Sequence, residues 1–301
     1  VFGSAVVACK LMGLDAFATA NALGIAGSQA GGLLAFLSSE ASTKQLHPGF
    51  ASQGGILAAR LAAAGASGPR NVFEGPHGVF DALASGVVDP ETILRDLGED
   101  WETTRIGIKP YPVCQLSHAT VAAMQNAMDQ ESFDSSDIVE IRAQVHPASA
   151  SIVCAEDRDL VHPASPYAAK FSLPWSVAAL AVDGALSTET FFPESVARSN
   201  VAEVAARVRW DVTLSPPGLA ADAPGDVVVQ LGDGRRGVGH VDRSGGAEPV
   251  PLSMESLMAK FERNIGHAEP ELIENILGLE SLPNVERILQ LSEQAVAQNR
   301  E

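Results

Sequence analysis

The chain has 301 residues, of which 46% are hydrophobic and only 5% aromatic, so it can bury the core of one large or two smaller domains. Its net charge of −17 argues against nucleic acid as a partner, because no basic stripe is present to neutralise phosphates. The sequence shows no membrane-length apolar run and no signal peptide, and its cysteines lack C-x-x-C spacing, so we expect a cytoplasmic protein that does not bind membranes.

The first third of the chain is rich in small and apolar residues with helical spacing. Asp15 is placed to cap a helix. We expect helices over residues 1–12, 16–28, 50–64, 79–84 and 89–97.

A polar stretch at residues 42–55 separates two of these helices and contains Lys44 and His47. Pro48 cannot continue a preceding helix, but it can occupy the first turn of a new one. We therefore predict that Lys44 and His47 lie on a loop and at the mouth of the following helix, where backbone N–H groups favour an anion. The alternative interpretation is a solvated surface loop.

The pattern changes after Trp101, where Pro110 and Pro112 block a helix. Alternating apolar residues predict strands over 139–145 and 207–214. A hairpin is expected from strands 227–231 and 237–241, joined by a type I′ turn at Asp233-Gly234. Further helices are expected over residues 115–128, 171–180, 254–263, 269–277 and 283–297.

These elements predict a mainly α fold with an α+β part. The simplest arrangement is a helical domain formed by both ends of the chain, residues 1–105 and 251–301, with an inserted α+β domain over 106–250.

Motifs for common cofactors are missing. The glycines near residue 24 do not fit G-x-G-x-x-G, no P-loop or G-x-S-x-G occurs, and the histidines lack metal-ligand spacing. If the protein is an enzyme, we expect it to use no metal, nucleotide or other cofactor.

Four separated motifs stand out: Gly24-Ile-Ala-Gly-Ser-Gln-Ala-Gly31, Thr43-Lys-Gln-Leu-His-Pro-Gly49, Gly107-Ile-Lys-Pro-Tyr-Pro-Val-Cys114 and Pro166-Tyr-Ala-Ala-Lys-Phe-Ser-Leu-Pro174. They spread over about half of the chain, and the third is followed by His118. Together they resemble the MmgE/PrpD family, which includes 2-methylcitrate dehydratase, cis-aconitate decarboxylase and iminodisuccinate epimerase. The resemblance implies a helical domain with a smaller lid domain, matching the arrangement above.

The resemblance also implies a cofactor-independent lyase or isomerase that acts on a small di- or tricarboxylate, either dehydratase-like or epimerase-like. Lys44 and Lys109 would hold substrate carboxylates, and His47 or His118 would move protons. Cys114 would be a thiol acid or base. The remaining substrate-binding positions would be Ser28, Gln29 and Trp175.

Two positions depart from cis-aconitate decarboxylase within this family. Cys114 replaces an active-site histidine and Trp175 replaces a tyrosine, so both argue against that particular decarboxylation.

Each candidate also has a structural interpretation. Lys109 fits an exposed strand end, His118 a packing histidine, His47 a helix cap and Cys114 an inert buried thiol. Ser28 and Gln29 fit helix-end packing, and Lys170 is expected to form a structural ion pair. The alternative function is a non-catalytic helical subunit or fragment that needs a partner chain to complete the site.

The chain begins at Val1, inside a helical pattern and without a methionine. The resemblance implies that the family's preceding helical segment is lacking, together with part of the expected site. Apolar surface around residues 1–37 should then be exposed, and we expect a homodimer or a complex with the missing segment.

Overall fold

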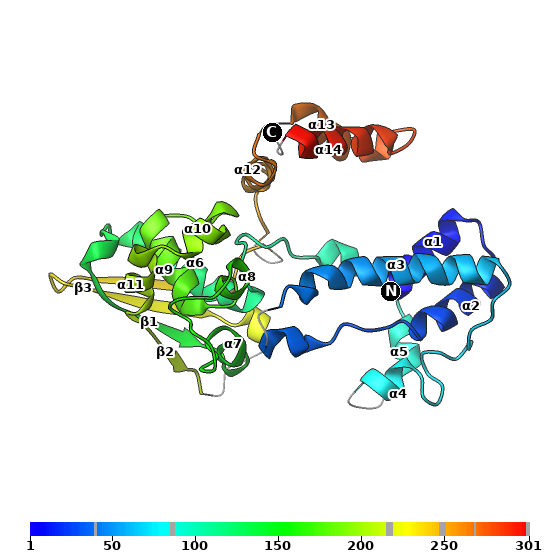
Figure 1. Ribbon diagram of the computed structural model, residues 1–301, viewed down its shortest axis with the longest axis horizontal. Coiled ribbons are helices and arrows are strands. Elements are labelled where there is room, and N and C mark those ends of the chain that lie inside the picture. Colours follow the sequence, from blue (N-terminus) through cyan, green and yellow to red (C-terminus); the bar gives the residue numbers. More distant parts are fainter. Residues whose placement is uncertain (39–40, 85–87, 215–218, 247–250, 268, 299–301) are drawn as a thin grey trace. The chain divides into compact units, whose positions relative to one another are not determined.

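The computed structural model describes residues 1–38, 41–84, 88–214, 219–246, 251–267 and 269–298. The chain divides into two compact units, an N-terminal unit of residues 1–104 and a C-terminal unit of residues 105–301 (Figure 1). The boundary lies next to the predicted one, and the predicted grouping of residues 251–301 with residues 1–105 stays a prediction.

Three helices build the N-terminal unit: α1 (Phe2–Leu11), α2 (Ala16–Gly27) and α3 (Thr43–Ala63). Asp15 caps α2 as predicted, with its carboxylate accepting a hydrogen bond from the Ala18 amide at 2.8 Å. The helices pack through alanines, which lets their axes approach closely: the buried ones include Ala5, Ala22, Ala26, Ala58 and Ala59. A short helix, η1 (Leu34–Ser38), lies between α2 and α3, and two more, α4 (Val79–Leu83) and α5 (Pro90–Leu94), follow α3.

The predicted loop around Lys44 is wrong. Helix α3 begins at Thr43 rather than near residue 50, so Lys44 and His47 lie in its first two turns and Pro48 lies inside the helix. Proline has a φ compatible with a helix, so α3 continues through Pro48, but it loses the hydrogen bond to the Lys44 carbonyl and crowds that carbonyl with the proline ring.

The C-terminal unit contains a four-stranded sheet in the order β2-β1-β3-β4. The strands are β1 (Ile138–Val145), β2 (Val208–Val212), β3 (Gly225–Leu231) and β4 (Arg236–Val241). The first two confirm the strands predicted from alternation, and the last two confirm the predicted hairpin. Strand β1 runs parallel to β2 and antiparallel to β3, which pairs antiparallel with β4. The hairpin turn is not type I′, because Gly234 has φ +90° while Asp233 does not have a positive φ.

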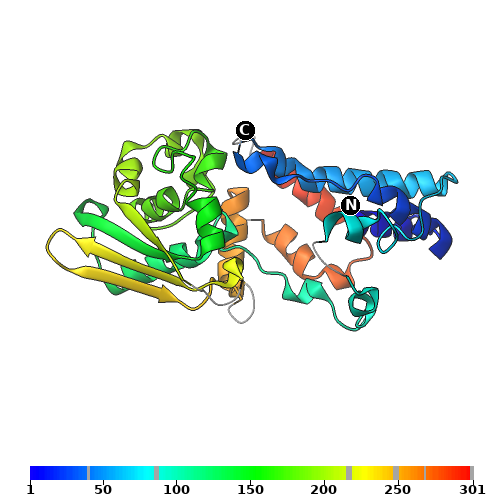
Figure 2. The ribbon, with the colours of Figure 1, turned by 90° about the horizontal axis from the view of Figure 1, so that it is seen from below.

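Helices cover one face of this sheet (Figure 2). Helix α6 (His118–Gln130) packs on β3 and β4, and α9 (Leu173–Asp183) packs between α6 and α11 (Ser199–Ala205). A Cβ at Gly239 would lie 1.8 Å from the Ala123 carbonyl oxygen, so this position of β4 must be glycine for α6 to approach. Between the layers lies the main core, which includes Met124, Ile141, Trp175, Leu180 and Leu231.

Several short helices were not predicted: α7 (Pro147–Val153), α8 (Pro166–Ala169), η5 (Glu189–Phe191) and α10 (Pro193–Val196). The unit ends with α12 (Met254–Ile265), α13 (Pro270–Leu277) and α14 (Glu286–Gln298), close to the predicted bounds. The mainly α fold with a small α+β part is therefore confirmed. In the described part of the chain, no helix combines the length and apolar character that crossing a membrane requires.

Candidate functional site

Gln29 and His47 line one pocket of the N-terminal unit, with a volume of about 470 Å³. The ends of α1 and α2 and the second turn of α3 form it, and its floor includes Gly31-Gly32. A Cβ on Gly32 would meet the His47 ring at 3.5 Å, an ordinary van der Waals contact, so the backbone rather than space favours glycine here: its φ is +110°. Ser28 is exposed at the C-terminal end of α2 and does not line the pocket.

Phe36 lies beside two side chains at the start of α3, Lys44 and His47. Its ring is 5.9 Å from the His47 ring in an edge-on geometry, and the Lys44 ammonium is 5.8 Å from its centre. Cation–π contact and edge-to-face packing thus orient Lys44 and His47 with a single aromatic residue. The N-terminal unit therefore brings Gln29, His47 and Lys44 together.

Lys109 and His118 share one backbone acceptor in the C-terminal unit. The Val113 carbonyl accepts from the Lys109 ammonium and lies against His118 Nε2, both at 3.3 Å. In addition, the Lys260 ammonium of α12 donates to the Lys109 carbonyl at 2.8 Å. Residues 106–109 belong to no helix or strand, so these contacts hold Lys109 where regular structure does not.

His118 is completely buried, and its ring packs edge-on against Tyr111 at 5.4 Å. Burial lowers its pKa from 6.5 to about 4, and the nearby Lys109 and Lys260 charges act in the same direction against the Val113 hydrogen bond. At neutral pH the imidazole is uncharged, and its bond to a carbonyl requires the proton on Nε2. This geometry suits a residue that positions Val113, and the predicted proton transfer by His118 stays a prediction.

Cys114 and Trp175 differ sharply in how exposed their side chains are to solvent. The Cys114 side chain is half-buried, and its amide donates to the Lys170 carbonyl at 2.9 Å. Trp175 is fully buried against Phe191, with ring centres 5.3 Å apart. Trp175 is therefore part of the main core, and its predicted substrate contact stays a prediction.

Lys170 does not form the predicted ion pair with any described residue. Its ammonium lies 5.5 Å from the centre of the Phe191 ring, and burial lowers its pKa. The other two cysteines are inert by position: Cys9 and Cys154 are buried, and burial raises the pKa of Cys154 to about 12.

A second pocket, of about 220 Å³, opens beside Lys109. Gln115, Asp222 and the segment Arg243–Gly246 line it, none of which the sequence motifs identified. Gln115 directly follows the third motif, so its position was a usable signal. Arg243 lies far along the chain and carried no local signal.

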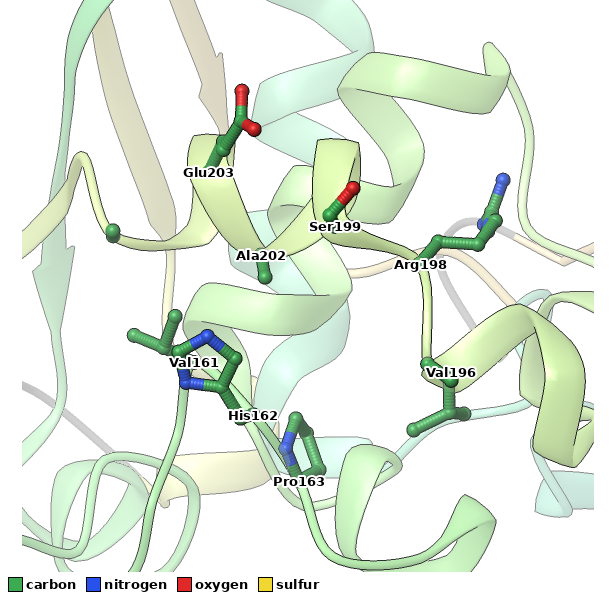
Figure 3. A pocket seen from close by; sticks show the side chains of 10 residues that line it. Val161, His162, Pro163, Val196, Arg198, Ser199, Ala202 and Glu203 are labelled. Carbon is green, nitrogen blue, oxygen red and sulfur yellow. The ribbon is translucent and has the colours of Figure 1, made fainter.

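A groove of about 500 Å³ lies elsewhere in the C-terminal unit (Figure 3). Most of its lining is apolar. The Arg198 guanidinium pairs with Asp183 at 2.7 Å, and the His162 ring lies 3.4 Å from the Asp159 carboxylate. Arg198 and Glu203 point away from His162 and Pro163. No group of histidine, cysteine and acidic side chains suited to a metal ion occurs among the described residues. The groove therefore lacks the chemistry that the motifs predict.

The predicted residues thus form two sets, one around His47 and one around Lys109. They belong to different units, so the predicted common cleft for Lys44 and Lys109 stays a prediction.

Comparison with known proteins agrees with the motifs. The chain is 28% identical over 304 residues to cis-aconitate decarboxylase of Aspergillus terreus, an alignment that covers 94% of this chain and 61% of that protein. It is 26% identical over 276 residues to human cis-aconitate decarboxylase, covering 87% of this chain and 54% of the human protein. A cis-aconitate decarboxylase-like protein of Aspergillus oryzae is 34% identical over 134 residues, or 42% of this chain and 28% of that protein.

The chain therefore spans about half to three fifths of the length of the full relatives that it matches along most of its sequence. Residues 1–91 match the MmgE/PrpD N-terminal domain, and residues 111–277 match the MmgE/PrpD C-terminal domain. The chain belongs to the MmgE/PrpD family.

Proposed function

We propose that the protein is a cofactor-independent lyase that acts on a small polycarboxylate. The observation that carries this proposal is the fixed ammonium of Lys109 beside a polar pocket, in a chain with a net charge of −17. A cation held in this way favours a carboxylate ligand. The names of the relatives favour cis-aconitate as a substrate, although Cys114 and Trp175 depart from the residues expected for that reaction.

In this proposal Lys109 neutralises one substrate carboxylate while charge develops on the carbon skeleton. In a decarboxylation the C–C bond to a carboxylate breaks, carbon dioxide leaves with that carbon, and the electron pair stays on the skeleton until a proton is delivered. In a dehydration the proton next to a carboxylate is removed and the hydroxyl leaves as water. Fixed cations stabilise the negative charge in both cases without reorganising.

The proton would be moved by His47, whose half-buried ring lines a pocket, while His118 would position Lys109 through Val113. Lys44 would provide the second cation. Gln29 would contact the ligand from the same pocket as His47, whereas Ser28 would support the turn at the end of α2.

An epimerase is a second candidate because of Cys114. Its thiol is half-buried, unlike those of Cys9 and Cys154, and a thiol can accept and return a proton next to a carboxylate. The variant Cys114→Ser separates the two readings: a thiol-dependent proton transfer would be nearly abolished, whereas a lyase that uses other groups would change little.

A further proposal concerns a partner chain. Among the described residues of 1–37, several large apolar side chains are exposed, including Leu11 at 84% and Leu33 at 81%. Monomeric proteins rarely expose large contiguous apolar areas, so a homodimer or a complex with a further polypeptide would cover them. Sedimentation of a compact monomer would contradict this proposal.

The proposed reaction is tested by incubating the protein with cis-aconitate, 2-methylcitrate or iminodisuccinate and following each solution by proton NMR. We expect turnover of cis-aconitate or 2-methylcitrate and its loss in Lys109→Met. Turnover of neither compound, or of iminodisuccinate alone, would contradict the lyase assignment.

A further inference from the structure

The pocket beside Lys109 joins three segments of the C-terminal unit. Lys109 comes from the segment before α6, Asp222 from η6 (Ala220–Asp222), and Arg243 and Ser244 from the segment after β4. Gln115 opens η3 (Gln115–Ser117) and completes the polar lining.

Hydrogen bonds fix this pocket. The side-chain amide of Gln115 donates to the Ser244 hydroxyl at 3.2 Å, and Ser244 is only 5% exposed. The Ile108 amide, one residue before Lys109, donates to the Gly246 carbonyl at 2.6 Å. The segment after β4 is therefore tied to both sides of Lys109.

Gly246 is essential to this connection. It has φ +108°, and a Cβ there would lie 2.1 Å from the Ile108 carbonyl oxygen. Any other residue would be strained in its backbone and would force the two segments apart. A glycine at this position thus allows the segment after β4 to approach the backbone next to Lys109.

The charges in the pocket favour an anion. Arg243 Nη2 and Asp222 Oδ1 are 2.5 Å apart, with 36% and 41% of the side chains exposed. This pair orients the guanidinium, and no other partner of the Arg243 side chain occurs in the described part of the chain. Lys109 and Arg243 together outnumber the single carboxylate, so the lining has a net positive charge within a strongly acidic protein.

We propose that this pocket binds a carboxylate of the substrate, with Arg243 as the second cationic contact beside Lys109 and Gln115 as an amide donor. A guanidinium binds a carboxylate through a planar pair of N–H groups, so Arg243 adds a geometric requirement that a lysine lacks. The pocket then selects for an additional carboxylate: tricarboxylates bind more tightly than dicarboxylates of the same skeleton. This inference rests on the proposed carboxylate substrate and extends it to the number of carboxylates.

Saturated analogues test the inference without turnover. Calorimetry with the protein would compare tricarballylate, which has three carboxylates, with glutarate, which has two on the same five-carbon chain. We expect Arg243→Met to weaken tricarballylate binding about tenfold to a hundredfold, the range for losing one charged hydrogen-bonding contact. Glutarate binding should change less than threefold, because Arg243 recognises the additional group.

Arg142→Met is the matched control. Arg142 also pairs with an aspartate, Asp211, at 3.1 Å and is similarly exposed, but it lies on the sheet away from this pocket. The control should bind both analogues like the unaltered protein. Arg243→Lys should recover only part of the affinity, and thermal melting should show that all variants are folded.

The outcomes distinguish this inference from the proposed function. Equal weakening of both analogues by Arg243→Met, or of neither, would overturn the role of Arg243. If Arg243→Met fails in one of these ways but Lys109→Met abolishes binding of the analogues, the proposed carboxylate substrate stands, while the proposed selection for a third carboxylate is wrong. Failure of the unaltered protein to bind either analogue would overturn both.

Discussion

The two basic sets of this protein are held in different ways. Lys44 and His47 lie on the first turns of a regular helix and take their orientation from one aromatic ring, Phe36. Lys109 lies on an irregular segment and is held by two hydrogen bonds. Its ammonium donates to the Val113 carbonyl, and its own carbonyl accepts from the Lys260 ammonium. Regular structure satisfies its backbone internally, whereas an irregular segment must find partners elsewhere, and those partners place Lys109 beside Arg243.

The two units that carry these sets also differ in how their cores are packed. Alanines fill the N-terminal unit, while a large apolar core lies between helices and sheet in the C-terminal unit. We therefore expect changes to the C-terminal core to disturb the Lys109 set most strongly.

The largest expected effect comes from Gly239→Ala. The new Cβ would overlap the Ala123 carbonyl of α6, so the helix must move away from the sheet and the free energy of unfolding should fall by about 3 kcal/mol. Denaturant unfolding measures this loss. Gly49→Ala is the control in α3, where a Cβ meets open space, and it should raise stability by up to about 1 kcal/mol. Equal effects of the two variants would contradict the packing comparison.

A pH effect of similar or smaller size is expected from His118. Its pKa is lowered to about 4 in the folded protein, so the unfolded chain binds this proton first as the pH falls. The free energy of unfolding should therefore decrease between the unfolded value of 6.5 and about 4, and His118 should add no further change outside that window. At about 1.4 kcal/mol per pKa unit the loss approaches about 3 kcal/mol.

His118→Gln separates this effect from other groups, because glutamine can donate to Val113 but does not titrate. The slope of stability against pH should flatten in this variant. His240 cannot produce the same loss, since the hydrogen bonds that its ring donates to Asp226 and then Asp242 raise its pKa, and its contribution to stability disappears as the pH rises. An unchanged slope in His118→Gln would show that the buried imidazole is not responsible.

The smallest expected effect is a difference in labelling rate among the three cysteines. Under native conditions at mildly alkaline pH, iodoacetamide should modify Cys114 first, because Cys9 and Cys154 are only 1% and 3% exposed. Peptide mass spectrometry identifies the labelled site, and labelling in denaturant should remove the difference. Early modification of Cys154 would contradict the described core.

Local patterns predicted much of this fold. Alternation identified the strands because one face of the sheet is buried, and Asp15 identified the start of α2 because its carboxylate caps the helix. The helices α7, α8 and α10 were missed since four to seven residues are too short for a helical period to show. Pro48 misled the prediction for α3 because proline usually marks the first turn of a helix, whereas α3 begins five residues earlier and tolerates it in the second turn.

The candidate site was less predictable. Motifs identified Lys44, His47 and Lys109, but residue type does not report burial, so the buried positions of His118 and Trp175 could not be read from sequence. Arg243 and Ser244 were missed because their contacts are not local: the bond from Gln115 to Ser244 spans 129 positions of the chain. Such pairings depend on the whole fold.

The most direct test is the activity of Lys44→Ala, Lys109→Ala and the double variant on the substrate identified by NMR. Each single change should lower kcat/KM by the equivalent of about 2–4 kcal/mol, the usual cost of losing one fixed charge-stabilising contact. The double variant should be no more active than the less active of the two single variants. Arginine in place of either lysine should retain activity only in part. Full activity in the double variant would contradict the assignment of both lysines to the site.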